Sequence, residues 1–183
     1  MKPIFWQFSP AVCVVVATLT VFVSYIALGN GKILEYLGWI KPLRPIYWFY
    51  GVLAGVLLAS FALVVLHLTN TPLGQSSGHK MFYGITVGPI LEEIIYRGAG
   101  FSVIYIVACS LRFAMHWRIV VAIIGTSLLF AVSHTLVVGI PWLIILMMGL
   151  SYGLMRWRSN SSAVTAVMHA SYNLLIAAAM ILR

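Results

Sequence analysis

The sequence predicts an all-α integral membrane protein, a bundle of about six transmembrane helices with polar catalytic residues in its core. The 183 residues are 62% hydrophobic and 8% charged, whereas soluble domains contain about 25% charged residues. The apolar residues form six runs that are long enough, or nearly long enough, to cross a bilayer as helices. The basic residues stand singly or in pairs between these runs, which is the pattern of membrane flanks. We therefore expect the lipid bilayer as a partner and no nucleic acid.

The six predicted spans follow one another without an internal repeat. Their approximate bounds are 9–29, 46–68, 82–111, 118–138, 140–156 and 163–182. The apolar run of the first span is nearer twenty residues than ten. That length favours a retained membrane anchor over a cleaved signal peptide.

The segment between the first two spans, 31–45, is predicted to lie flat on the membrane surface. Its apolar residues recur at helical spacing, with charged residues on the other face. These apolar residues are Ile33, Leu34, Leu37 and Ile40. We accordingly divide the chain into residues 1–80, with two N-terminal transmembrane helices and this amphipathic segment, and residues 81–183, a helical catalytic core. The two parts are expected to form one integrated bundle.

The distribution of basic residues predicts the orientation of the bundle. The connections after the first, third and fifth spans carry Lys32, Lys41, Arg44, Arg112, Arg118, Arg156 and Arg158. The opposite side carries Lys2, Lys80 and Arg183. Because cytoplasmic loops are enriched in Lys and Arg, we expect a multi-pass protein of the cell membrane with both termini on the non-cytoplasmic side.

Close helix packing is indicated by Gly-x-x-x-Gly pairs within the predicted spans. The pairs are Gly51/Gly55, Gly84/Gly88 and Gly149/Gly153. Such pairs allow transmembrane helices to approach one another closely. Packing within the bundle is the preferred interpretation, and a homodimer is the alternative.

Two of the three acidic residues of the chain, Glu92 and Glu93, are adjacent within the third span. An ionisable side chain near the middle of a bilayer costs roughly 2.5–3.5 kcal/mol, so these residues need partners or a use. Glu93 and Arg97 lie one turn apart and can form an ion pair. Glu92 is rotated by about 100° from Glu93, so it must be protonated, bonded to another helix or exposed to a water-filled cavity. Pro89 removes one helical hydrogen bond and predicts a kink nearby.

Further polar groups occur on the fourth and sixth spans. The fourth span contains Phe130-Ala-Val-Ser-His134, and the sixth contains His169-Ala-Ser-Tyr-Asn173. Together with Glu92, these groups match what amide hydrolysis by water requires. Glu92 can accept a proton from water while His134 holds or polarises it. His169 and Asn173 can donate hydrogen bonds to a developing oxyanion. We expect these four side chains to converge on one small wet pocket.

The three motifs resemble the signature of a known family, the CAAX prenyl protease 2 and bacteriocin-processing group, also called CPBP or Abi. That signature is Glu-Glu-x-x-x-Arg, then Phe-x-x-x-His, then His-x-x-x-Asn or His-x-x-x-Asp, on successive transmembrane helices. Here the motifs begin at Glu92, Phe130 and His169, and the resemblance covers about residues 81–182. It implies a glutamic-type intramembrane endopeptidase that cleaves a membrane-embedded or lipid-modified protein or peptide.

The resemblance also implies a role for each site residue. Glu92 and His134 would activate the water, and His169 and Asn173 would stabilise the oxyanion. The supporting residues would be Glu93, Arg97 and Phe130. No cofactor is expected, because the sequence lacks His-Glu-x-x-His. Zinc is the alternative, held by Glu92, His134 and His169.

Two other functions are compatible with parts of the sequence. Gly149-Leu-Ser-Tyr-Gly153 matches Gly-x-Ser-x-Gly, so Ser151 and His169 could form a rhomboid-like serine protease dyad. That interpretation leaves Glu92 without a function, and packing explains the glycines more simply. A non-catalytic membrane binder, immunity factor or scaffold of the same fold is the alternative from a different class, since buried carboxylates and histidines also mark ion pathways.

Overall fold

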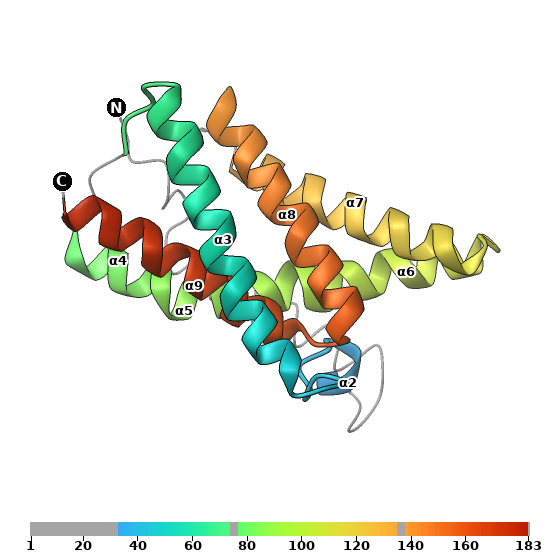
Figure 1. Cartoon of the computed structure of the whole chain (residues 1–183). Coiled ribbons are helices and arrows are strands. Elements are labelled where there is room, and N and C mark those ends of the chain that lie inside the picture. Colours follow the sequence, from blue (N-terminus) through green and yellow to red (C-terminus); the bar gives the residue numbers. More distant parts are fainter. Residues whose placement is uncertain (1–32, 74–76, 135–137, 183) are drawn as a thin grey trace.

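The computed structural model describes residues 33–73, 77–134 and 138–182, and within these ranges it contains helices and no strand (Figure 1). The first predicted span, 9–29, lies outside them. The helices are α2 (Ile33–Tyr36), α3 (Ile46–Leu68), α4 (Gly78–Ile85), α5 (Val87–Glu93), the π-helix η1 (Ile94–Gly100), α6 (Phe101–Ser110), α7 (Met115–Ser133), α8 (Ile140–Ser159) and α9 (Ser162–Ile181). The predicted fold class, an all-α membrane bundle, is confirmed.

Four of these helices, α3, α7, α8 and α9, are long and apolar enough to cross a membrane. They coincide, within a few residues at each end, with the second, fourth, fifth and sixth predicted spans. The third predicted span, 82–111, is also helical but is divided into α4, α5, η1 and α6.

The division of the third span begins at Thr86, three residues before Pro89, which agrees with the predicted kink nearby. Pro89 has no N–H for the carbonyl of Ile85, and α4 ends at that residue. Thr86 follows with φ −110° and ψ −79°, and its hydroxyl donates to the carbonyl of Phe82 at 2.7 Å. The π-helix η1 then carries Arg97 and begins directly after the two glutamates. The π-helix is rare in proteins, and the instances that occur are often found at functional sites.

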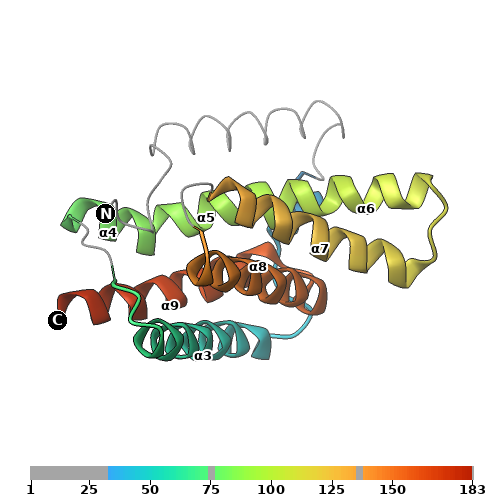
Figure 2. The same ribbon diagram turned by 90° about the horizontal axis from the view of Figure 1, so that it is seen from above.

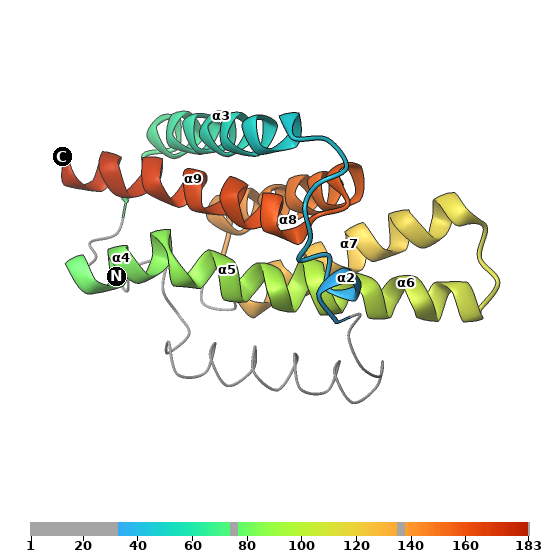
Figure 3. The ribbon, with the colours of Figure 1, turned by 90° about the horizontal axis from the view of Figure 1, so that it is seen from below.

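Helix α9 lies at the centre of the bundle, between α3 on one side and α5 on the other (Figures 2 and 3). Helix α8 packs against α7 and also contacts α9 and α3, while α6 and α7 run side by side. The apolar window of α9 is 50% buried, compared with 28% for α3. The polar residues of α9 are therefore placed in the interior of the protein.

Helix α3 has the pattern of a lipid-facing helix. Its buried stripe consists of Gly51, Gly55, Ala59, Ala62 and Leu66. Its larger apolar side chains point outward, so that Leu57 is 59% exposed and Phe61 is 48% exposed. In a bilayer this outer surface meets hydrocarbon, while the small residues permit close helix packing.

Two of the glycine pairs pack inside the bundle. A Cβ at Gly55 would collide with the backbone carbonyl of Met168 on α9. A Cβ at Gly149 would lie 3.1 Å from Ser127 on α7. The preferred interpretation of these glycines, internal packing, is therefore confirmed for both pairs, and the homodimer stays a prediction.

The segment 31–45, predicted to lie flat on the membrane surface, is helical only over Ile33–Tyr36 among its described residues. Its place on the membrane surface stays a prediction. Helix α2 ends at Tyr36, and Gly38 has φ +62° with the guanidinium of Arg156 where a side chain would be. Leu37 is 2% exposed, so it packs on protein. The carbonyl of Gly38 accepts from the N–H of Ser162 at 2.7 Å. The chain reverses here because glycine tolerates the left-handed conformation.

Four basic residues lie in or beside the two connections that meet here, and we call this region the basic end of the bundle. They are Lys41, Arg44, Arg156 and Arg158. The N–H of Leu43 donates to the carbonyl of Ser159 at 3.0 Å, which brings the two basic connections together. This agrees with the predicted grouping of these residues on one side. Which side of the membrane they face stays a prediction.

Candidate active site

Glu93, at the end of α5, is the centre of the polar cluster. Its Oε1 accepts a hydrogen bond from Nη1 of Arg97 at 3.3 Å. The same oxygen lies 3.2 Å from Nδ1 of His169 on α9. The side chains of Glu93 and Arg97 are both 0% exposed. The predicted ion pair between them is confirmed, and the structure adds the imidazole.

Arg97 is held by more than its carboxylate. Its Nη2 donates to the carbonyl of Gly149 on α8 at 3.1 Å. Its guanidinium carbon lies 4.5 Å from the ring centroid of Phe130 and 5.2 Å from that of Tyr152. A buried cation needs a counter-charge and further hydrogen bonds to offset its lost hydration. Aromatic faces contribute additional attraction, so Arg97 joins η1, α7 and α8.

Phe130 is the point at which the three sequence motifs meet. Its side chain is 1% exposed. The centroid of its ring lies 4.8 Å from that of His134, 5.3 Å from that of Tyr96 and 5.9 Å from that of His169. Its ring is therefore a neighbour of both histidine rings, and its supporting role stays a prediction.

The predicted span 118–138 placed His134 inside a helix, but His134 lies just after the helix end. Helix α7 ends at Ser133, and His134 has φ −93° and ψ 45°. Its Nδ1 lies 2.8 Å from the carbonyl of Phe130. The hydroxyl of Ser133 donates to the same carbonyl at 2.7 Å, so these two side chains take the place of the next backbone N–H at the helix end. Because a carbonyl only accepts, Nδ1 carries the proton, and Nε2 of the neutral ring is an acceptor.

His169 is buried on α9 and its ring is fixed from two directions. Glu93 engages Nδ1, as described above. The ring of Tyr152 stacks on the imidazole with the centroids 5.0 Å apart and the planes at 30°. A carboxylate on one ring nitrogen sets the orientation of the other. Nε2 is therefore the ring nitrogen that Glu93 does not engage.

Asn173 lies one turn after His169 on the same helix. Its Nδ2 donates to the carbonyl of Gly84 on α4 at 2.7 Å. A carboxamide has two N–H donors, so this contact orients the group and uses one of them. The hydrogen bond also ties α9 to the first segment of the divided span.

Glu92 differs from Glu93 in its surroundings. Its side chain is half-buried, and its Oε2 has no hydrogen-bond partner among the residues that the structure describes. His169 bonds Glu93 rather than Glu92. The convergence of Glu92, His134, His169 and Asn173 stays a prediction. The contacts that the structure shows join Glu93 directly to Arg97 and His169, and the rings of His134 and His169 both lie near that of Phe130.

The zinc alternative requires three ligands in one place. Within residues 33–73, 77–134 and 138–182, no three His, Cys, Asp or Glu side chains gather closely enough to hold a metal ion. Glu92, His134 and His169 therefore form no ready ligand set in this part of the chain. The expectation that no cofactor is used stays a prediction.

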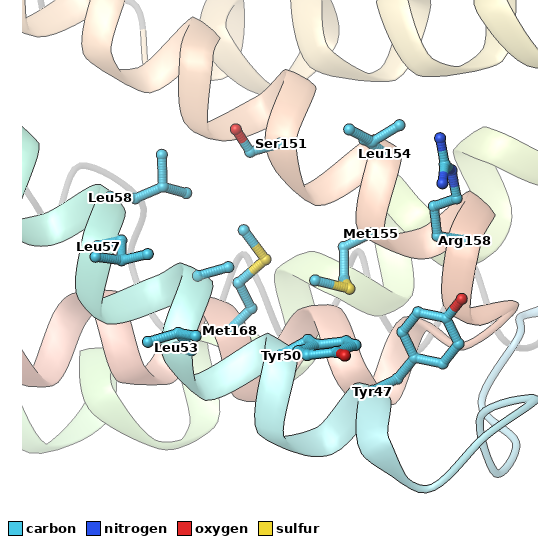
Figure 4. A pocket seen from close by; sticks show the side chains of 11 residues that line it. Tyr47, Tyr50, Leu53, Leu57, Leu58, Ser151, Leu154, Met155, Arg158 and Met168 are labelled. Atoms are coloured by element: carbon cyan, nitrogen blue, oxygen red, sulfur yellow. The ribbon is translucent and has the colours of Figure 1, made fainter.

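Ser151 faces away from the polar cluster. It lines a cavity together with residues of α3, such as Leu58 (Figure 4). The residue of α8 that meets His169 is the next one, Tyr152. Neighbouring residues on a helix point about 100° apart, so this geometry disfavours the Ser151/His169 dyad.

Sequence reasoning missed two contributors to the site. Tyr152 is 0% exposed and supports both His169 and Arg97. Gly149, interpreted only as a packing residue, also supplies the carbonyl that binds Arg97. The one signal for the burial of Tyr152 was its spacing of three residues from Gly149, which places both residues on the same face of α8.

Comparison with known protein families gave one match. The model described as Type II CAAX prenyl endopeptidase Rce1-like matches residues 74–175, which is more than half of the chain. This region contains all three motifs, from Glu92 to Asn173. No curated protein and no solved structure matches the chain.

Proposed function

The chain belongs to the type II CAAX prenyl endopeptidase Rce1-like family, and we propose that it uses Glu92-activated water to hydrolyse a peptide bond at the membrane. The family is one of CAAX-type intramembrane endopeptidases, and its substrates are membrane-associated, lipidated proteins. The substrate of this protein is proposed to be a membrane-anchored or lipid-modified protein or peptide.

The difference between the two adjacent glutamates is the observation that carries this proposal. Glu93 is enclosed and already bonded to Arg97 and His169. Glu92 is half-buried and has no hydrogen bond or ion pair among the described residues, although the Oε2 atoms of both glutamates are buried without a partner there. A general base must be able to reach the proton that it removes. We therefore propose that Glu92 transfers the proton and that Glu93 positions His169.

His134 is proposed to hold the attacking water. Its Nδ1 proton is used by the carbonyl of Phe130, so Nε2 presents a lone pair. A water that donates one hydrogen to His134 and the other to Glu92 keeps its own lone pair for the substrate carbonyl. Such fixation of the nucleophile lowers the entropic cost of reaching the transition state.

The oxyanion is proposed to be stabilised by His169 and Asn173. With Nδ1 directed at Glu93, a protonated His169 would present Nε2–H to the substrate. Glu93 shares its single negative charge with Arg97, so the cluster would then be net positive, which favours a developing oxyanion. Asn173 supplies its second N–H. Preorganised donors of this kind in a dry site are often the largest single contribution to catalysis.

The proposed reaction conserves atoms and protons as follows. Glu92 takes a proton from water as the oxygen attacks the carbonyl carbon, forming a tetrahedral oxyanion. The C–N bond then breaks, and the proton on Glu92 passes to the departing amine. The products are a new carboxyl terminus and a new amino terminus, and Glu92 returns to its starting state.

The proposal is tested by comparing membrane proteomes from cells that express the wild-type chain or Glu92→Gln, with new protein termini as the measurement. The control is Glu35→Gln, because Glu35 is the remaining acidic residue and is exposed on α2. We expect termini that depend on Glu92 and not on Glu35, at equal membrane abundance of the three proteins. Termini that survive Glu92→Gln would contradict the proposal and favour a non-catalytic binder.

A further inference from the structure

A cavity of about 620 Å³ lies between α3 and α8, with Met168 of α9 in its lining (Figure 4). We call it the α3–α8 groove. Its volume is within the roughly 300–1,000 Å³ of ligand pockets. Met168 precedes His169, whose polar contact is with Glu93. The groove is therefore a different site from the proposed active site.

The groove is polar at one end and aliphatic at the other. Figure 4 shows Tyr47 and Arg158 together at one end, and Leu57 and Leu58 at the opposite end. Arg158 belongs to the basic end of the bundle. An occupant that fits this lining has an anionic head and a hydrocarbon tail.

The aliphatic part of the groove faces the surroundings of the protein. Leu53 is 42% exposed, Leu57 is 59% exposed and Leu154 is 47% exposed. These residues lie on α3 and α8, which are two of the candidate membrane spans. In a bilayer the groove consequently opens sideways into the hydrocarbon, so that lipid can enter it without crossing water.

Arg158 has no acidic partner in the part of the chain that the structure describes. The ion pairs there both involve Glu93, and they join it to Arg97 and His169. The guanidinium of Arg158 instead lies 4.8 Å from the ring centroid of Trp157. Its donors therefore remain available for an anion, and arginine binds phosphate with paired hydrogen bonds.

We propose that the α3–α8 groove binds one anionic phospholipid of the bilayer. Its phosphate is bound by Arg158, with the hydroxyl of Tyr47 beside it, and one acyl chain lies along Leu53, Leu57 and Leu58. The proposal concerns a lipid that stays bound and does not depend on the proposed peptidase activity.

The head-group contact is tested by native mass spectrometry of the full chain released from nanodiscs that contain phosphatidylglycerol and phosphatidylcholine in equal amounts. We expect one retained lipid per chain, with phosphatidylglycerol preferred. Arg158→Gln should reduce that preference about fivefold, and added salt should weaken it, as for a basic residue near an anionic lipid surface. Arg44→Gln is the matched control, because Arg44 is exposed at the same end and lies outside the groove lining.

The tail contact is tested with Ala54→Trp, which fills the groove, and with Val52→Trp, which places the same side chain on the exposed face of α3 outside it. Loss of the retained lipid only in Ala54→Trp supports the assignment. Equal retention of the two lipids, an unchanged preference in Arg158→Gln, or retention by Ala54→Trp would overturn it. If Ala54→Trp does not fold, the Arg158→Gln comparison decides alone.

Discussion

Glu93 and His169 are 76 residues apart in the chain, and Oε1 of the glutamate lies 3.2 Å from Nδ1 of the histidine. The contact joins α5 to α9 inside the bundle and also fixes the orientation of the imidazole. The same oxygen binds Arg97. We therefore expect substitution of Glu93 to affect both the stability of the bundle and the position of His169. Substitution of the adjacent Glu92 should have a different effect.

Glu93→Gln should destabilise the protein by about 3–5 kcal/mol, because it leaves the buried guanidinium of Arg97 without a counter-charge. Glu92→Gln should change stability by less than about 1 kcal/mol, because the ion pairs of the described residues involve Glu93 and not Glu92. Thermal unfolding of both variants in the same detergent measures the difference. Equal destabilisation by the two substitutions would contradict the separate roles.

Tyr152 is expected to act through its ring. Its hydroxyl is buried and has no hydrogen-bond partner within the described ranges, so Tyr152→Phe should retain stability and cleavage. Tyr152→Ala should cost about 3–5 kcal/mol through the cavity that it leaves, and should lower kcat because His169 loses its stacking partner. Unfolding and cleavage rates of the two variants provide the comparison. Loss of activity in Tyr152→Phe would instead assign a function to the hydroxyl.

Ser151→Ala should leave cleavage unchanged, whereas His169→Ala should abolish it. Ser151 lines the α3–α8 groove and not the polar cluster. A fluorophosphonate probe that reacts with activated serines should accordingly fail to label the wild-type chain. Labelling that disappears in Ser151→Ala would restore the serine dyad.

Gly55→Ala should weaken the packing of α3 on α9. The added methyl would meet the carbonyl of Met168 and the side chain of Ser171, and overpacking typically costs about 1–3 kcal/mol. Gly78→Ala is the control, since a Cβ there has no neighbour within 4 Å. The midpoint of thermal unfolding should fall for the first variant and stay level or rise for the second.

Cleavage should withstand prolonged treatment with a zinc chelator. The three candidate ligands do not come together in the described part of the chain, and the proposed water is activated by Glu92 and His134. Activity of purified protein before and after chelation is the measurement. Loss of activity that zinc restores and magnesium does not would support the metal-dependent alternative.

Local features of the site were predictable from the sequence. The pair Glu93–Arg97 lies within one turn of the same span, so its formation depends only on helical geometry. The interruption near Pro89 follows equally from a missing N–H. The positions of the four long apolar helices follow from hydropathy, because an uninterrupted apolar run of that length has no other stable environment.

Contacts between helices were decided by tertiary structure. Whether His169 meets Glu92 or Glu93 depends on a rotation of about 100° and on the depth of one helix relative to another, and neither quantity is encoded in the spacing of residues within a motif. The end of α7 at Ser133, which brings the His134 side chain onto a backbone carbonyl, and the stacking of Tyr152 on His169 have the same origin. Sequence alone determined which polar groups are placed in the apolar spans, and packing determined which of them are bonded to one another.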